Sequence, residues 1–181
     1  MLVAAQRAFI ERIGVASVEA SAQNMLKPAL QHNPTYVPSA DPTDKALFRR
    51  DFAQRVFSLT EAYRIGMSEN DHVAQIVQMA DELSADHARI LKNGRLRIGT
   101  VQKALNIHLK TVWCLGPTFP EPPHCPVDRI VLQAAGLSGS WTQLDSIQTY
   151  QEWIELLREF AVAQGYASLG QWELSAWTAL A

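Results

Sequence analysis

Two residues of opposite charge, Lys103 and Asp128, each stand close to the expected start of a helix. Lys103 follows a basic turn at residues 94–99, where unsatisfied N–H groups and the positive end of the helix macrodipole disfavour the ammonium form of a lysine. Asp128 falls in the first turn of the next expected helix, where the same dipole favours the carboxylate anion. The two residue types suit an amine nucleophile beside a carboxylate. Each also has an ordinary explanation, as a surface lysine and a helix-capping aspartate.

The chain between these two residues is long enough to bring them together. A helix from Lys103 to Gly116 spans about 20 Å at about 1.5 Å per residue. The following loop, residues 117–128, is rich in proline, which removes backbone donors and prevents it from forming helix or an inner strand. When extended, it can return by up to about 37 Å at about 3.1 Å per residue. We therefore expect Lys103 and Asp128 to line the floor of one cavity.

The positive charge of the chain is concentrated in one segment. The formal net charge of the chain is −2, but residues 87–120 carry six Lys and Arg and no Asp or Glu. Residues 1–86 and 121–181 have net charges of −3 and −5. Such a segment can attract phosphates without making the whole surface basic. Besides Lys103, its cations are Arg89, Lys92, Arg95, Arg97 and Lys110. The alternative is a solvated helix face whose counter-charges come from other segments.

The elements that must position these residues are all expected to be helices, because the apolar spacing is helical almost everywhere. The first is one long helix or two short ones broken near Gly14 and ending at Lys27-Pro28. The next begins with Asp41 as N-cap and ends at Gly66, and a third runs from Ser68 to Asn93-Gly94. Later helices are expected from Thr100 to about Leu115, from Pro126 to about Ala135, from Asp145 or Ser146 to Gly165, and from Ser168 onward.

These patterns predict an all-α fold over residues 1–181: a single irregular helical domain of about seven helices, either undivided or arranged as two lobes around a cleft. A basic, catalytic segment is expected at residues 87–132. No apolar run is long enough to cross a bilayer, and Arg7 and Glu11 interrupt the start of the chain too early for a signal peptide. We therefore expect a soluble, cytoplasmic protein without a membrane partner. Cys114 and Cys125 are expected to be thiols.

The run from Gly94 to Leu132, GRLRIGTVQKALNIHLKTVWCLGPTFPEPPHCPVDRIVL, resembles the catalytic segment of helix-hairpin-helix DNA glycosylases, especially the branch with archaeal 8-oxoguanine glycosylases. In that superfamily a glycine-containing hairpin holds DNA phosphates through backbone N–H groups. A lysine opens the next helix in bifunctional members, and a Pro-Val-Asp-like element supplies a carboxylate. The resemblance implies that Lys103 is a Schiff-base nucleophile, that Asp128 is the carboxylate, and that Gly94 and Gly99 lie in the hairpin. It covers about 39 of the 181 residues.

The resulting hypothesis is a DNA N-glycosylase, with or without AP-lyase activity, that swings a damaged or modified base out of the duplex into a pocket. Asp128 would steady oxocarbenium-like charge while Lys103 attacks C1′. His124 is expected to contact the flipped base or a phosphate, and Glu173 beside Trp172 to close the pocket. No cofactor is expected. A metal site at Cys114, His124 and Cys125 is disfavoured because their spacing lacks the pairs typical of zinc sites.

Two other function classes remain open at this point. The first is a non-catalytic helical module that binds DNA or RNA through residues 89–110, with Lys103 acting only as a cation. The second is a protein-interaction or assembly factor that uses the tryptophan-rich C-terminal helices. The sequence leaves the lesion, the choice between DNA and RNA, and the oligomeric state undecided.

Overall fold

The computed structural model describes residues 2–31 and 33–180, the last three of these by their backbone only. Apart from one isolated bridge between Tyr36 and Leu91, these residues form helices and loops, so the all-α prediction is confirmed. The α-helices are α1 (Leu2–Ile13), α2 (Val18–Asn24), α3 (Leu26–Leu30), α4 (Pro42–Ser58), α5 (Thr60–Arg64), α6 (Glu69–His87), α7 (Ile98–Leu115), α8 (Arg129–Ala134), α9 (Ile147–Ala163) and α10 (Leu169–Leu180). Two 3₁₀ helices, η1 (Lys92–Gly94) and η2 (Trp141–Gln143), lie in the connections.

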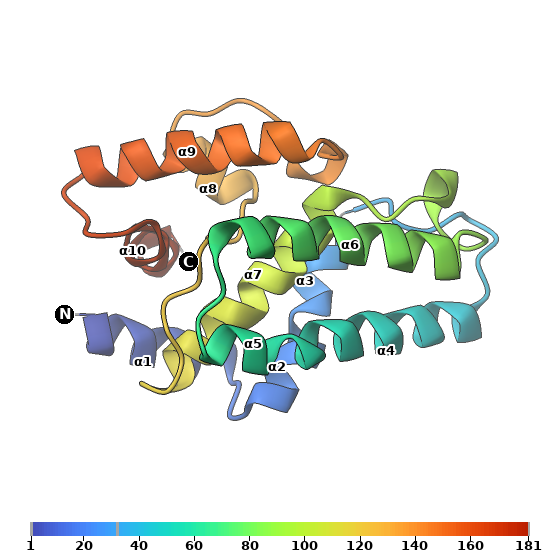
Figure 1. Cartoon of the computed structure of the whole chain (residues 1–181), viewed down its shortest axis with the longest axis horizontal. Coiled ribbons are helices and arrows are strands. Elements are labelled where there is room, and N and C mark those ends of the chain that lie inside the picture. Colours follow the sequence, from blue (N-terminus) through green and yellow to red (C-terminus); the bar gives the residue numbers. More distant parts are fainter. Residues whose placement is uncertain (1, 32, 181) are drawn as a thin grey trace.

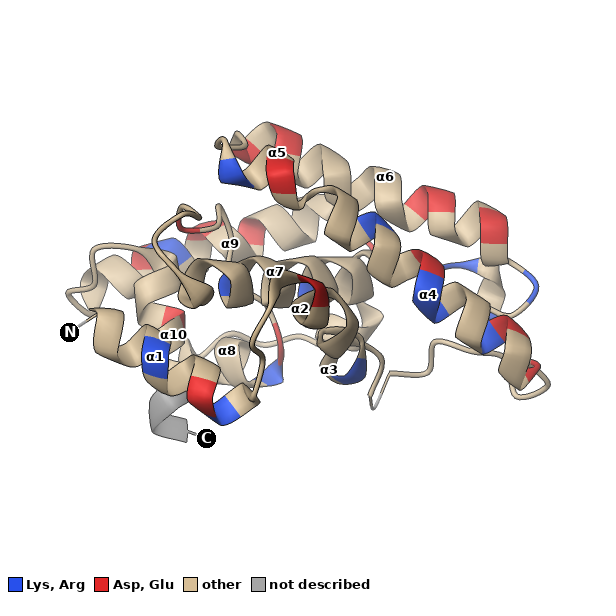
Figure 2. Ribbon diagram, turned by 90° about the horizontal axis from the view of Figure 1, so that it is seen from below, with Lys and Arg blue, Asp and Glu red and all other residues tan. Residues whose placement is uncertain are grey.

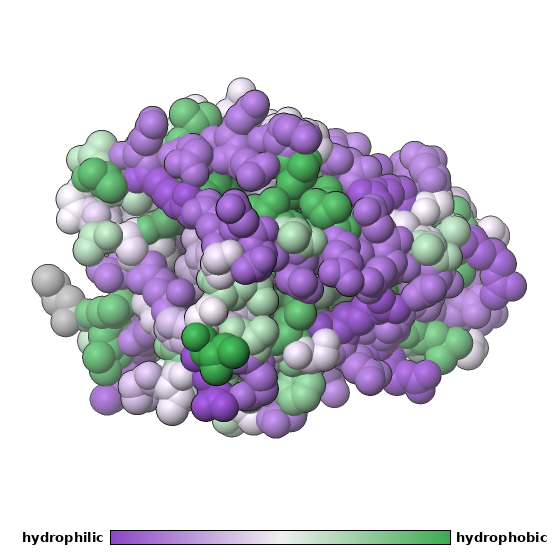
Figure 3. All heavy atoms as spheres, viewed as in Figure 1, coloured by the Kyte–Doolittle hydropathy of each residue, from purple (hydrophilic) through white to green (hydrophobic). Residues whose placement is uncertain are grey.

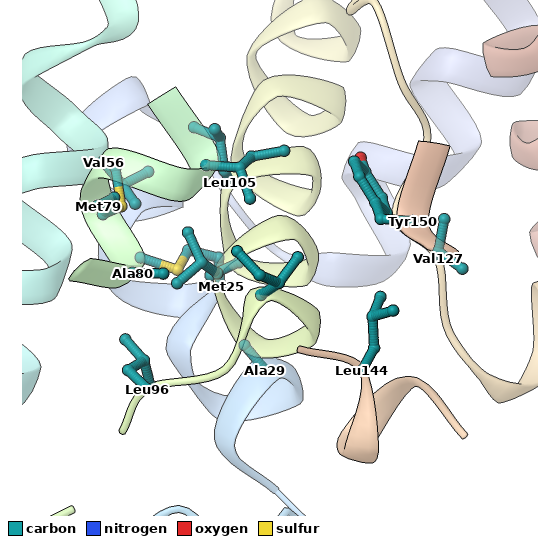
Figure 4. Packing of buried hydrophobic residues seen from close by; sticks show 14 of the residues in the cluster. Met25, Ala29, Val56, Met79, Ala80, Leu96, Leu105, Val127, Leu144 and Tyr150 are labelled. Atoms are coloured by element: carbon teal, nitrogen blue, oxygen red, sulfur yellow. The ribbon is translucent and has the colours of Figure 1, made fainter. Parts of the chain in front are cut away.

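Helix α7 is the centre of the fold, and the other helices surround it (Figure 1). It is buried along nearly its whole length, on every side. Its apolar residues join the main core together with side chains such as Met25, Val56 and Tyr150, which Figure 4 shows converging on it from different helices. A helix covered all round must provide partners or cavities for its polar side chains, since an unpaired polar group in the interior is costly. This requirement places the chemistry of the protein on α7.

Several predicted helix ends are confirmed at the level of their capping bonds. Asp41 accepts a hydrogen bond from the Thr43 N–H at 2.7 Å and precedes Pro42 at the start of α4. Ser68 caps α6, and Ser146 caps α9 through the Thr149 N–H at 3.2 Å. These caps are local, so the spacing of residue types along the chain is sufficient to find them.

Other predicted helix boundaries are wrong, in part because backbone groups form hydrogen bonds with segments distant in the sequence. The N-terminal region contains three helices, and Pro28 lies inside α3 rather than after a helix, in a first turn where its missing N–H costs little. The helix expected to reach Asn93 ends at His87. Residues 90 and 92 instead pair with the loop before α4, through Val37 N to Ile90 O and Lys92 N to Thr35 O, both at 2.9 Å.

The start of α7 differs from the prediction in a way that matters for Lys103. The N-cap is Arg97 instead of Thr100, so Lys103 lies one turn deeper in the helix than expected. Asp145 Oδ1 accepts the first N–H, from Ile98, at 3.1 Å. Because the effect of the helix macrodipole falls off within the first turn, it contributes little at Lys103. The surroundings of this amine are therefore decided by tertiary contacts.

The helix after the proline loop also starts later than Pro126, with Asp128 as its N-cap and Arg129 as its first residue. The face in Figure 3 is mainly hydrophilic, with hydrophobic patches between polar regions. Large exposed apolar side chains, such as Ile65 on the connection after α5 and Val162 on α9, belong to different elements. Within the described residues, no helix has the length and apolar character needed to cross a membrane.

Candidate active site

Lys103 and Asp128 meet in the structure. The Nζ atom of Lys103 lies 3.2 Å from Oδ2 of Asp128, although 25 positions separate the two residues in the chain. The side chains are 10% and 23% exposed, so the pair is mostly enclosed but still reaches solvent. The predicted proximity of an amine and a carboxylate is thus present.

The carboxylate of Asp128 divides its two oxygens between two tasks. Oδ1 accepts the N–H groups of Ile130 and Val131 at 2.9 and 3.1 Å, which caps α8, while Oδ2 faces Lys103. Hydrogen bonds from the helix N-terminus fix the orientation of the group. The capping explanation and the catalytic one therefore do not compete, because the cap aims the second oxygen at the amine.

Trp141 covers the other side of the Lys103 amine. Its ring centre lies 4.1 Å from Nζ, an arrangement that attracts a cation to the ring face. Trp141 can take this position only because residue 99 is glycine: a Cβ there would lie 1.9 Å from the Trp141 carbonyl oxygen. Gly99 is thus required for the close approach of η2 to α7.

Two cavities, of about 460 and about 450 Å³, share Lys103 and Asp128 in their walls. We call the larger one cavity A; it extends between α1, α7 and α10 and includes Phe9, Lys110, Glu173 and Trp177. The smaller one, cavity B, extends toward Arg129 and η2 and includes Ser140 and Trp141. A group bound across the pair would therefore have space on both sides of the amine.

One face of α7 supplies polar side chains to the wall of cavity A. Lys103, Ile107, Lys110 and Thr111 line it and stand at positions i, i+4, i+7 and i+8 of the helix, which lie on one face. Lys110 does not contact solvent in the way that a phosphate-binding lysine would: its Nζ bonds both oxygens of Glu173, at 2.8 and 2.9 Å. Both side chains of this pair are at most 5% exposed.

Opposing effects act on Glu173. Burial raises the pKa of its carboxyl group, and the Lys110 ammonium counteracts part of this rise. The same ammonium lies 4.4 Å from the centre of the Phe9 ring and 5.2 Å from that of Trp177. Cavity A therefore ends in a fixed array of two aromatic rings, a cation donor and a carboxylate acceptor.

Gln102 joins the two segments that carry Lys103 and Asp128. Its side chain donates to the Val127 carbonyl at 2.7 Å and accepts from the Val127 N–H at 3.1 Å. Gln102 precedes Lys103 and Val127 precedes Asp128. These two hydrogen bonds therefore fix the position of Lys103 relative to Asp128. Gln102 has no exposed surface and also donates to the Gly99 carbonyl.

A buried polar chain continues from Gln102 to the surface. Asn106 contacts Gln102 and donates to Tyr150 Oη at 2.9 Å, and Tyr150 Oη in turn contacts His124 Nδ1 at 2.8 Å. The other nitrogen of His124 lies 3.1 Å from Glu69, which pairs with Arg158. Burial lowers the pKa of His124 to about 4, against the opposing influence of Glu69. His124 therefore has a structural partner on each side.

The residues predicted to bind phosphates are mostly engaged within the protein. Arg89 pairs with Asp44, Arg95 with Asp81 and Asp145, and Lys110 with Glu173. Including the Lys103–Asp128 pair, four of the six cations of the basic segment thus have carboxylate partners, each from outside the segment. The counter-charge alternative describes this segment better than the phosphate-surface prediction does.

The remaining phosphate candidates behave differently from one another. Arg97 donates to the Thr142 carbonyl, and Lys92 is exposed. The Gly99 N–H donates to the Leu144 carbonyl at 2.8 Å and the Gly94 N–H to Leu91 at 2.9 Å, so neither is available to a phosphate. The expectation that these two glycines present N–H groups to DNA is therefore wrong, because the segment around Leu144 and the preceding turn occupy them.

The predicted pocket residues divide in the same way. Glu173 lines cavity A, as expected of a pocket residue. Trp172 packs in the core against Phe160, and His124 is enclosed by the polar chain, so neither lines cavity A or cavity B. Cys114 and Cys125 are free, buried thiols, and burial raises the pKa of Cys114 to about 12.

Sequence reasoning missed Gln102, Trp141 and the pairing of Lys110 with Glu173. A detectable signal existed for Lys110: Lys103, Lys110 and Thr111 are spaced to lie on one face of the same helix. No local signal identifies Trp141, which reaches the site from a distant connection. Comparisons with protein-family models, with curated proteins and with solved structures found no match to this chain.

Proposed function

We propose that this protein is a DNA N-glycosylase with lyase activity that uses Lys103 as its nucleophile. The observation that carries the proposal is that the Lys103 amine lies 3.2 Å from the Asp128 carboxylate, which is oriented because it also caps α8. Both residues line two cavities. An exposed surface lysine would not need such an enclosure, and a purely capping aspartate would not need an amine on its second oxygen. The arrangement supports chemistry at an electrophilic carbon held between the cavities.

In the proposed reaction the free amine of Lys103 attacks C1′ of the target nucleotide as the N-glycosidic bond breaks. The departing base takes the electron pair of the broken bond and a proton from solvent. Asp128 Oδ2, adjacent to the reacting centre, stabilises the positive charge that develops on the sugar and receives the proton that the amine loses. Asp128 then gives this proton to O4′ as the C1′–O4′ bond breaks, which opens the ring and leaves a protonated imine between Lys103 and C1′. Loss of a C2′ proton to solvent then permits elimination of the 3′ phosphate.

Cavity A is the proposed site of the extruded base. A base swung out of a duplex is held by stacking and by hydrogen bonds to its edge. Phe9 and Trp177 offer ring faces, Lys110 offers a donor, and Glu173 offers an acceptor. Cavity B, with Arg129 and the polar side chains of η2, is then left for the sugar and the flanking backbone.

Trapping of a covalent adduct tests this proposal. The protein is incubated with duplexes that carry different damaged or modified bases, sodium borohydride is added, and released base is measured in parallel. We expect a trapped adduct and base release on at least one duplex, and loss of both in Lys103→Gln. Asp128→Asn keeps an amide oxygen for the α8 cap and removes the carboxylate, so we expect slow turnover in a folded protein.

Lys92→Gln is the matched lysine control, because Lys92 is exposed and lines neither cavity. An adduct that persists in Lys103→Gln and disappears in Lys92→Gln would contradict the assignment of the nucleophile. Base release without an adduct would indicate a monofunctional glycosylase that uses water. If neither product forms on any duplex while salt-dependent DNA binding remains, the non-catalytic nucleic-acid module is the better description. An interaction role for the C-terminal tryptophans has little support, since Trp172 is buried and Trp153 packs against the core.

A further inference from the structure

Four cations that lack carboxylate partners lie together on α3 and α4, outside the basic segment. Within the part of the chain that the structure describes, Lys27 on α3 and Lys45, Arg49 and Arg50 on α4 form no ion pair. Lys27, Arg49 and Arg50 are exposed, and Lys45 is partly exposed. We call these four residues the α3–α4 cationic face. Figure 2 shows blue segments on α3 and α4 in the view from below.

A groove runs between these cations. Two hollows of about 490 and about 430 Å³ share Gln23, Leu26 and Arg49, so they are continuous along α2, α3 and α4. Arg50 lines the first, and Lys27 lines the second. Leu26 contributes an apolar wall to both. The groove thus has a largely apolar lining, with Lys27, Arg49 and Arg50 along it.

The groove leads to the catalytic pair. Its second hollow includes Lys27 and Gln31, while Lys27 also lines cavity A and Gln31 also lines cavity B. Helix α3 therefore forms a shared wall between the groove and both cavities. A strand that entered a cavity beside Lys103 could continue across α3 into the groove without leaving the surface.

Two of the cations are held in place before any ligand binds. Lys45 Nζ lies 5.5 Å and the Arg49 guanidinium carbon 5.8 Å from the centre of the Tyr36 ring. Contact with the ring restricts these long side chains, so less conformational entropy is lost when they bind an anion. The nearest opposing charge in the groove is Glu19, which lines only the hollow farther from α3. The side chain of Glu19 interacts with Ser17 and the N-terminus of α2, which lower its pKa.

We infer that the α3–α4 cationic face binds the phosphate backbone of the DNA that flanks the target nucleotide, in place of the basic segment of residues 89–110. This inference rests on the proposed function for the identity of the ligand. Phosphodiesters are the appropriate occupant because three cations without ion pairs, Lys27, Arg49 and Arg50, line a groove that shares the wall of α3 with the two cavities beside Lys103. The basic segment is unsuited to this role, since most of its cations are already neutralised within the protein.

The test compares two triple variants that remove the same charge. Lys45→Gln/Arg49→Gln/Arg50→Gln alters the face, and Arg64→Gln/Arg89→Gln/Lys92→Gln removes exposed cations elsewhere. Binding to a duplex with a tetrahydrofuran abasic analogue is followed by fluorescence anisotropy between 50 and 200 mM salt. Each lost phosphate contact reduces the slope of log K against log salt by about 0.9. We expect the face variant to lose about 2 to 3 units of slope and at least about tenfold in affinity at low salt.

The control variant is expected to bind within about threefold of the unaltered protein, with an unchanged slope. Equal binding by the face variant, or a larger loss in the control variant, would overturn the inference. Adduct trapping separates this result from the proposed function. If the face variant binds normally and still forms the adduct, the inference fails and the function stands. If no lesion gives an adduct but the face variant loses binding, the function fails and the binding surface stands.

Discussion

Helix α7 carries two lysines that pair with carboxylates, and the two pairs are built differently. Lys110 and Glu173 form a doubly hydrogen-bonded pair that is at most 5% exposed and enclosed by Phe9 and Trp177. Lys103 makes one contact of 3.2 Å to Asp128, and the second oxygen of that carboxylate caps α8. Both lysines line cavity A, seven residues apart on one helix face.

The difference distinguishes the Lys110 amine, which is fixed by two hydrogen bonds to Glu173, from the Lys103 amine, which has one contact to Asp128. An ammonium bonded to both oxygens of a buried carboxylate is held in one geometry, as a recognition element requires. A nucleophile must instead lose a proton and move toward carbon. Lys103 contacts one carboxylate oxygen and the face of Trp141, and it lines two cavities, which fits the second requirement. The sequence predicted phosphate binding for Lys110, whereas in the structure its amine bonds Glu173.

Breaking the buried pair is expected to have the largest effect. Lys110→Met leaves the Glu173 carboxylate buried without a counter-charge, and removal of one partner of such a pair typically costs about 3–5 kcal/mol. Lys103→Met leaves Asp128 with its helix N–H bonds and partial exposure, so we expect a loss of about 1 kcal/mol. Urea unfolding of both variants measures the free energy of unfolding.

The double variant Lys110→Met/Glu173→Leu is the control for this comparison. It removes both charges, so much of the lost stability should return. Equal destabilisation by the two single variants would show that the pairs do not differ in the way described.

His108 is a polar residue of α7 that, unlike Lys103 and Lys110, is fully buried. It lies 3.0 Å from Ser21 Oγ and 2.9 Å from Thr60 Oγ1, and burial lowers its pKa to about 4 from 6.5. Between these values the unfolded chain binds more protons than the folded chain, so stability falls as the pH falls from about 6.5 to about 4. At about 1.4 kcal/mol per pKa unit, the contribution of His108 to this loss is about 3 kcal/mol.

His108→Gln should therefore be less stable at pH 7 but lose less stability on acidification than the unaltered protein. Thermal or urea unfolding at several pH values between 7 and 4 measures both slopes. Parallel curves for the two proteins would contradict the buried, neutral state of this histidine. The other buried histidines contribute to both curves and cancel in the difference.

Gln102 provides a test of how Lys103 is positioned relative to Asp128. Gln102→Met keeps the apolar volume but leaves the Val127 N–H and carbonyl without their partners, which is expected to cost about 2 kcal/mol. If Gln102 positions Lys103 relative to Asp128, trapping should slow about tenfold while affinity for the abasic-analogue duplex stays the same. Gln102→Glu can accept from Val127 but cannot donate, so it should restore only part of the rate. A rate loss matched by an equal loss of affinity would indicate general disruption instead.

Local patterns were sufficient for much of the fold. The all-α class and the caps at Asp41, Ser68 and Ser146 follow from apolar periodicity and from side chains that bond N–H groups two or three residues away. Helix ends that depend on distant partners could not be found in this way. The start of α7 at Arg97 depends on Asp145, and the end of α6 depends on pairing between residues 90–92 and the loop before α4.

For the candidate site, the amino-acid sequence alone identified Lys103 and Asp128 as a pair and showed that the intervening chain was long enough for contact. It also showed that six cations are concentrated in residues 87–120. Only the tertiary structure decided which charges are neutralised, because Asp44, Asp81, Asp145 and Glu173 all come from other segments. Charge along a chain is a local property, whereas ion pairing, burial and cavity walls depend on contacts between segments far apart in sequence. The contact between Lys103 and Asp128 could be proposed because the chain between them is long enough to permit it, whereas the neutralisation of the other cations could not be predicted.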